Sequence, residues 1–163
     1  MARNDILAYS SSRGGTYEVQ SFPLGAAQSF DEGDPVVFNG GSLREASNDP
    51  ADVVGIAAVR SIDKDDAVRA TGTLIQVTLG SSDQLFQTTN FATDGAGTSA
   101  TPTQANAIGA TAGLILTGGS WFVDTGAGNA IVQIESLLDV TGTDIANPNV
   151  LTTAGDRVIF RFI

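Results

Sequence analysis

Cysteine and histidine are both absent from this chain of 163 residues. Without cysteine, neither a disulfide bond nor a thiolate metal site can stabilise the fold. Without histidine, the chain lacks the commonest general base, the commonest metal ligand and the usual pH switch. We therefore expect a protein that is not an enzyme and that needs no metal ion and no other cofactor.

Positive charge and long apolar runs are also scarce. The chain has 8 Lys and Arg against 18 Asp and Glu, for a net charge of −10, and its one lysine is Lys64. Binding to nucleic acid requires a basic surface, so we expect no nucleic-acid partner. No apolar run approaches the roughly 20 residues of a membrane-spanning helix, and no basic segment with an apolar run follows Met1. We expect no membrane partner and synthesis in a cytoplasm.

What the chain does contain points to short strands. Hydrophobic residues make up 42% of the sequence, charged residues 16%, and there are 19 glycines. This composition, with much Thr, Ser and Ala, is typical of many short strands joined by turns. The length suits one hydrophobic core. The fold class predicted is all-β, a single compact β-barrel or sandwich domain of short strands and hairpins with at most one short helix.

The clearest local pattern lies between Phe30 and Val59. Pro35 to Phe38 reads as a strand, Asn39-Gly40-Gly41 reverses the chain, and Leu43 to Ala46 returns it. Asn-Gly supplies the positive φ angles that tight hairpin turns need. After Asp49-Pro50, the apolar run 53–59 predicts a third strand.

Alternating apolar residues predict further strands, and one segment predicts a helix. The strands are expected at 16–22, 74–79, 84–88, 114–116, 120–123, 132–135 and 158–163. Thr101-Pro102 resembles a helix N-terminus, so a short helix is expected within 102–112. The last strand is apolar on both faces, so it should be central in its sheet or covered by a partner.

Together these segments resemble small phage-encoded proteins that decorate, or cement, the heads of tailed bacteriophages. The resemblance rests on the GDPVVF-turn-GxLxxA hairpin, on the VVGIAA strand, and on the stretches 101–114, 118–125, 130–134 and 156–163. It implies a structural virion protein, made in the cytoplasm of a bacterial host, that lies on the outer capsid surface. Its implied partners are the major capsid protein and itself, as a homotrimer. The alternative is an all-β carbohydrate- or receptor-binding module of a phage particle.

Two patterns that could indicate a ligand are better explained by structure. The acidic turn from Asp63 to Asp66 resembles the start of a calcium loop, but Val68 and Leu74 stand where such a loop needs Gly and Glu. Gly126-Ala127-Gly128 resembles part of a phosphate-binding turn, but Ile131 stands at its third glycine position. We expect a solvated turn and an ordinary loop.

The domain organisation expected is a flexible N-terminal arm, residues 1–15, followed by a β-domain, residues 16–163. The arm is either a frayed terminus or a segment that becomes ordered on a neighbouring subunit. Six residues are the candidates for contact with the capsid or between subunits: Ile6, Leu7, Tyr9, Arg13, Trp121 and Phe122. Because neighbouring strand residues point to opposite faces, one ring of Trp121 and Phe122 should be buried, and the other should point outward.

Overall fold

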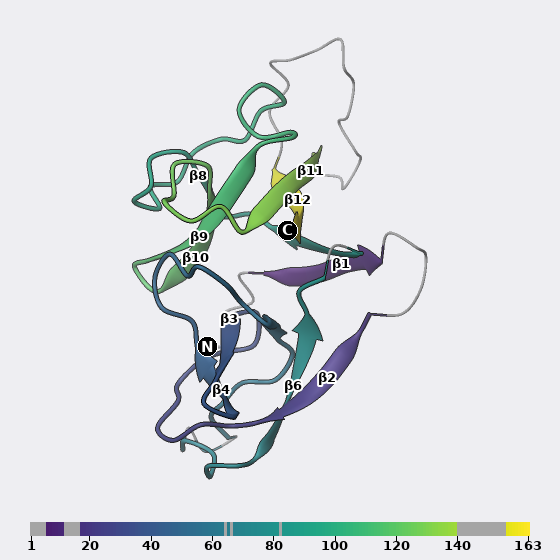
Figure 1. The fold of residues 1–163 in the computed structure, drawn as a ribbon. Helices are drawn as coiled ribbons and strands as arrows, with labels where there is room; N and C mark the ends of the chain where they lie inside the picture. Colours follow the sequence, from purple (N-terminus) through teal and green to yellow (C-terminus); the bar gives the residue numbers. More distant parts are fainter. Residues whose placement is uncertain (1–5, 12–16, 64, 66, 82, 140–155) are drawn as a thin grey trace.

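The computed structural model describes residues 6–11, 17–63, 65, 67–81, 83–139 and 156–163 (Figure 1). These residues contain strands and turns and no helix, which confirms the all-β class. The strands are β1 (Leu7–Ser11), β2 (Val19–Pro23), β3 (Pro35–Asn39), β4 (Ser42–Glu45), β5 (Gly55–Ala57), β6 (Leu74–Leu79), β7 (Gln84–Thr88), β8 (Phe91–Ala92), β9 (Thr111–Thr117), β10 (Ser120–Asp124), β11 (Val132–Leu138) and β12 (Arg157–Phe162).

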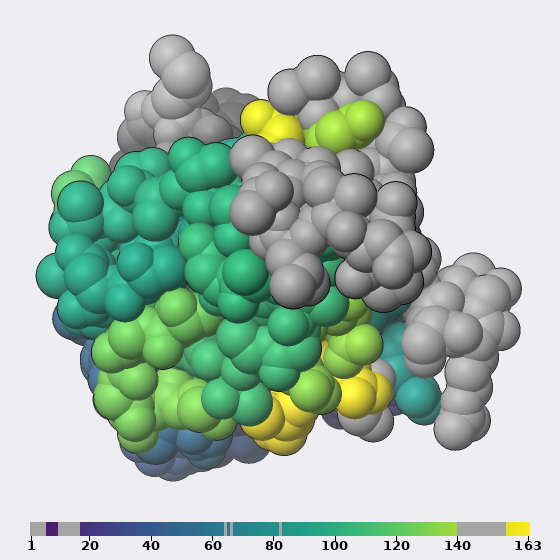
Figure 2. Space-filling view, turned by 90° about the horizontal axis from the view of Figure 1, so that it is seen from above, coloured from purple at the N-terminus to yellow at the C-terminus, as the bar shows by residue number. Residues whose placement is uncertain are grey.

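The strands form two sheets that pack together as a β-sandwich (Figure 1). The seven-stranded sheet has the order β1-β7-β12-β11-β9-β10-β8, and the five-stranded sheet has the order β2-β6-β5-β3-β4. Strand β8 runs parallel to β10, and the other neighbours are antiparallel. The end of the molecule seen in Figure 2 is formed mainly by the teal and green segments that follow β7.

The first core lies between the two sheets. Trp121 and the aromatic group Phe86, Phe160 and Phe162 fill much of it, and Ile56 of β5 and Ala46, which follows β4, also belong to it. The ring centroids of Phe86 and Phe162 are 5.3 Å apart in an edge-to-face arrangement, which is a favourable aromatic contact. Burial of these large side chains is the main force that holds the sheets together.

The second core lies on the other face of the five-stranded sheet. It consists of seven buried apolar side chains: Leu24, Phe30, Val36, Leu43, Ala57, Ile75 and Val77. The sheet curls so that the chain after β2 meets β4, through a bridge between Leu24 and Leu43 and a 2.9 Å hydrogen bond from Gly25 N to Leu43 O. The five-stranded sheet is therefore covered on both faces.

The hairpin expected at Asn39-Gly40-Gly41 is confirmed. Val36 to Asn39 pairs with Ser42 to Glu45, and Gly40 and Gly41 have φ angles of 61° and 81°. Two consecutive positive φ angles define the turn that matches the twist of a hairpin. The β9–β10 hairpin repeats this geometry at Gly118 and Gly119, with φ angles of 59° and 83°.

Among the other strand predictions, 74–79 and 84–88 match β6 and β7, and β12 lies centrally between β7 and β11 as expected. The predicted helix at 102–112 is wrong. The segment forms turns and then enters β9 at Thr111. Gly109 has a φ angle of 78°, and its N–H donates to the Ile134 carbonyl at 2.8 Å, so pairing with β11 replaces the helical hydrogen bond.

The structure also differs from the expected N-terminal arm. Within that arm, residues 6–11 belong to the sandwich: Ile6 is buried in the first core, and β1 pairs with β7 along the edge of the seven-stranded sheet. The physical reason is that β7 offers β1 a row of main-chain hydrogen bonds while Ile6 buries its side chain. Residues 1–5 and 12–15 of the arm lie outside the described residues.

Candidate interaction surface

The structure separates the six predicted contact residues. Ile6 and Trp121 are 1% and 0% exposed, so they stabilise the first core and cannot contact a partner from there. The expectation that one ring of Trp121 and Phe122 is buried is confirmed, because Phe122 lies half-buried on the opposite face of β10. Arg13 lies outside the described residues.

Leu7 and Tyr9 are exposed, and the structure adds two further exposed apolar side chains, Tyr17 and Val19. The Tyr17 hydroxyl donates to the Tyr9 carbonyl at 3.0 Å, which joins the chain beside β1 to the chain before β2. We call these four residues the edge patch, because β1 and β2 are edge strands of the two sheets. A strand was expected at 16–22, and β2 begins at Val19, but both Tyr17 and Val19 are exposed.

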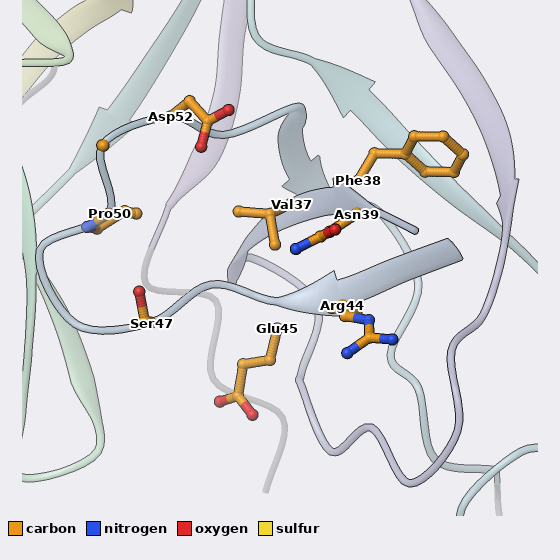
Figure 3. Close-up of a pocket in the computed structure, with 9 residues that line it drawn as sticks. Val37, Phe38, Asn39, Arg44, Glu45, Ser47, Pro50 and Asp52 are labelled. Atoms are coloured by element: carbon orange, nitrogen blue, oxygen red, sulfur yellow. The ribbon is translucent and has the colours of Figure 1, made fainter. Parts of the chain in front are cut away.

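A hollow of about 550 Å³ lies between the β3–β4 hairpin and the loop that follows β4 (Figure 3). The hairpin register places Val37 opposite Arg44, so both side chains lie on one face of the hairpin. Val37 also packs against the first core, and the loop contributes buried Pro50 and exposed Ala51. The remaining lining residues are Phe38, Asn39, Glu45, Ser47 and Asp52.

The loop beside the hollow is anchored to the seven-stranded sheet. Asn48 Oδ1 accepts a hydrogen bond from Leu116 N at 2.7 Å. The Asp49 carboxylate accepts from Gly128 N and Asn129 N, each at 3.1 Å, and the Asn129 side chain donates to the Asp49 carbonyl at 2.7 Å. These bonds connect residues 68 to 80 positions apart. They therefore tie the loop after β4, which continues the five-stranded sheet, to the seven-stranded sheet.

Asp49 adopts a left-handed conformation, with a φ angle of 50°. This conformation costs about 1–2 kcal/mol for most residues, and Asp tolerates it better than most. Strand β9 beside Asp49 requires glycine at position 113, because a Cβ atom there would collide with Asn129 O and lie 3.1 Å from Asp49 Oδ1. The sequence presented Asp49-Pro50 only as a separator between strands and carried no signal of this anchor.

A second carboxylate organises the loops at the β8–β10 end of the sandwich. Asp124 is fully buried and accepts hydrogen bonds from Gly95 N, Gly97 N and Gly126 N at 2.8 to 3.1 Å. The glycine turn that resembled a phosphate site therefore donates one of its N–H groups to this side chain. An aspartate placed in this way fixes loop geometry.

The acidic turn at 63–66 follows the same principle. The Asp63 carboxylate accepts from Asp65 N and Ala67 N, and these hydrogen bonds lower its pKa below the usual value. Lys64 and Asp66 lie outside the described residues.

Within the part of the chain that the structure describes, no group of three or more His, Cys, Asp or Glu side chains is arranged to hold a metal ion. No described helix is long and apolar enough to cross a membrane.

Comparison with known proteins gives no relative: no family model, no curated protein and no solved structure matches this chain.

Proposed function

We propose that this protein is a structural protein of a bacteriophage particle, one that binds the outer surface of the capsid and cements contacts between major capsid proteins. The sequence resemblance motivates the proposal. The segments that carry it form β3, β4, β5, β9, β10, β11 and β12, which are the framework of both sheets. The resemblance therefore concerns the scaffold of the fold.

The observation that carries the proposal is the edge patch. Leu7, Tyr9, Tyr17 and Val19 are 38% to 47% exposed, and they account for half of the eight large apolar side chains that the described surface exposes. Exposed apolar side chains on and beside the edge strands of a sandwich indicate a surface that can bind another protein. Tyrosine suits such a surface because it buries a large ring and still forms a hydrogen bond.

A cement protein acts by adding buried area across the joints between capsid subunits. Each copy opposes the separation of the subunits beneath it, and many copies on one lattice turn a modest affinity per site into a large total stabilisation. The implied homotrimer fits a site of local three-fold symmetry, since a symmetric oligomer presents one surface to each of several identical subunits. The net charge of −10 suits a component that stays away from the packaged DNA.

The test is a co-sedimentation titration on purified expanded capsids that lack this protein. Replacing Leu7 and Tyr9 together with alanine should weaken binding about tenfold or more, because truncation of interface anchors typically costs more than 1 kcal/mol each. Val68→Ala is the matched control, since Val68 is 50% exposed outside the edge patch. Circular dichroism checks that each variant is folded.

Two results would count against the proposal. The first is no binding of the unaltered protein to these capsids. The second is retention of the protein on a glycan array with no affinity for capsids, which would favour the carbohydrate-binding alternative.

A further inference from the structure

The hollow between the β3–β4 hairpin and the following loop contains Arg44, whose side chain has no partner among the described residues. The other four described arginines each donate a hydrogen bond or form an ion pair within the chain: Arg60 to Asp63 O at 2.6 Å, Arg69 to Arg60 O at 3.2 Å, Arg157 with Asp156 at 3.7 Å, and Arg161 with Glu135 at 2.7 Å. No described residue forms such a contact with the Arg44 side chain, although the chain has 18 acidic residues to offer.

Three further polar side chains in the hollow are available to a ligand. Asn39, Ser47 and Asp52 are exposed, and the described part of the chain provides no hydrogen-bond partner for any of these side chains. Figure 3 shows the Asp52 carboxylate and the Asn39 amide on two sides of Val37. The hollow thus combines a few apolar side chains with hydrogen-bond donors and acceptors that can fix the orientation of a ligand.

We propose that this hollow binds an extended segment of a partner polypeptide. A carboxylate of that segment pairs with the Arg44 guanidinium, a small apolar side chain lies on Val37, Pro50 and Ala51, and Asp52 accepts a main-chain N–H. The proposal rests on the proposed function, under which the partner is the major capsid protein.

Arg44 is the one basic residue among those that line the hollow, beside the acidic Glu45 and Asp52, so a partner carboxylate is favoured only where it reaches the Arg44 guanidinium. The protein carries a net charge of −10, so a partner carboxylate is repelled over most of its surface. Arg44 offers the planar pair of donors that a carboxylate accepts in a bidentate ion pair. Asp52 and Glu45 disfavour a second carboxylate elsewhere in the hollow, so the bound segment should carry a single carboxylate at this place.

Both walls of the hollow are held in place by hydrogen bonds within the chain. Its hairpin wall is fixed by the β3–β4 register, and its loop wall is fixed by the hydrogen bonds of Asn48 and Asp49 to the seven-stranded sheet. Its volume of about 550 Å³ lies within the roughly 300–1,000 Å³ of typical ligand sites. A rigid site loses little conformational entropy on binding, which raises its affinity for a flexible segment.

The test measures binding of variants of the full chain to capsids that lack this protein. Arg44→Ala should weaken co-sedimentation about tenfold or more, and Arg44→Lys should weaken it less, because lysine keeps the charge and loses the paired donors. Asp52→Ala should weaken it about threefold, as expected for one hydrogen bond. The controls with the same charge changes, Arg157→Ala and Glu32→Ala, lie outside the hollow and should bind as the unaltered protein does.

A photo-crosslinking amino acid gives a second readout. Placed at Ala51 in the hollow, it should join this protein to the major capsid protein, whereas the same group at exposed Ala105 should not. This inference alone would be overturned if the Arg44 and Asp52 variants bound capsids as tightly as the unaltered protein does. It would also be overturned if the unaltered protein bound capsids but the group at Ala51 gave no cross-link. If the unaltered protein did not bind the capsids, this inference and the proposed function would both be overturned. Both would also be overturned if the unaltered protein bound a glycan and the Arg44 and Asp52 variants lost that binding.

Discussion

The first core and the second core lie on opposite faces of the five-stranded sheet, but they are closed in different ways. The first core is covered by a second sheet and filled by Trp121 and a group of phenylalanines. The second core is covered by the curl of its own sheet and by the irregular chain from Leu24 to Phe30. That chain is held by Ser61, whose hydroxyl accepts from Phe30 N at 2.8 Å and donates to Gln28 O at 3.0 Å.

This difference shows how one short sheet can support two cores. Along β3, Val36 faces the second core and Val37 packs against the first, so each strand residue serves the core on its own side. Because both cores share β3 and β5, loss of either should unfold the whole sandwich. The first core is the larger and more aromatic of the two, so its loss should cost more.

The largest effect is expected in the first core. Trp121→Ala should lower the free energy of unfolding by about 3–5 kcal/mol, because the side chain is fully buried. Phe122→Ala is the control, since its half-buried ring faces the other side of β10 and should cost under about 2 kcal/mol. Urea unfolding followed by circular dichroism measures both. Equal losses would show that the two rings do not divide between core and surface.

In the second core, Leu43→Ala should cost about 3 kcal/mol, within the range for a buried leucine. Trp121 is the single tryptophan and lies only in the first core, so its fluorescence reports on the core that is not mutated. We expect fluorescence and circular dichroism to shift together in urea, as in two-state unfolding. If the fluorescence transition stayed at its original midpoint, the two cores would be independent units.

The anchor between the sheets should give a smaller effect. Asp49→Ala removes two accepted hydrogen bonds and places alanine at a φ angle of 50°, so we expect a loss of about 2 kcal/mol. For a chain of this size, that loss lowers the melting temperature by roughly 4–8 °C. Asp49→Asn keeps an acceptor oxygen and tolerates the conformation, so it should cost under about 1 kcal/mol. Equal losses in the two variants would mean that the charge matters more than the geometry.

Local sequence signals predicted the parts of the fold that local chemistry determines. Asn39-Gly40-Gly41 predicted a hairpin because consecutive residues with positive φ suit almost nothing else. The bounds of β6 and β7 followed from alternating apolar residues between turns. Contacts between distant residues were not predictable in this way. Ile6 lies in a Ser- and Gly-rich stretch, and only pairing with β7, far along the chain, makes β1 a strand.

The same limit explains the site. Asn48 and Asp49 look like ordinary turn residues until Leu116 and Asn129 are placed beside them. The hollow is formed by residues that are individually common in turns, and Arg44 becomes notable only when the other described arginines are seen to be paired. The helix expected at 102–112 failed for a related reason, since a hydrogen bond from Gly109 to Ile134 overrides local preference.

The smallest effect is expected in a loop that belongs to neither core. Asp94 is exposed, and hydrogen bonds from the Thr98 side chain and from Ala96 N lower its pKa from 3.8 to about 2. A carboxyl group whose pKa is lower in the folded protein stabilises the fold above its unfolded pKa, and that contribution is lost as the pH falls from about 4 to 2. The melting temperature of Asp94→Asn should therefore fall less steeply over this range than that of the unaltered protein.

Thr98→Val should raise the pKa of Asp94 toward 3.8, measured by NMR titration of the carboxyl carbon. An Asp94 pKa near 3.8 in the unaltered protein would show that these hydrogen bonds do not persist in solution, and the loop would then have no part in the stability of the sandwich at low pH.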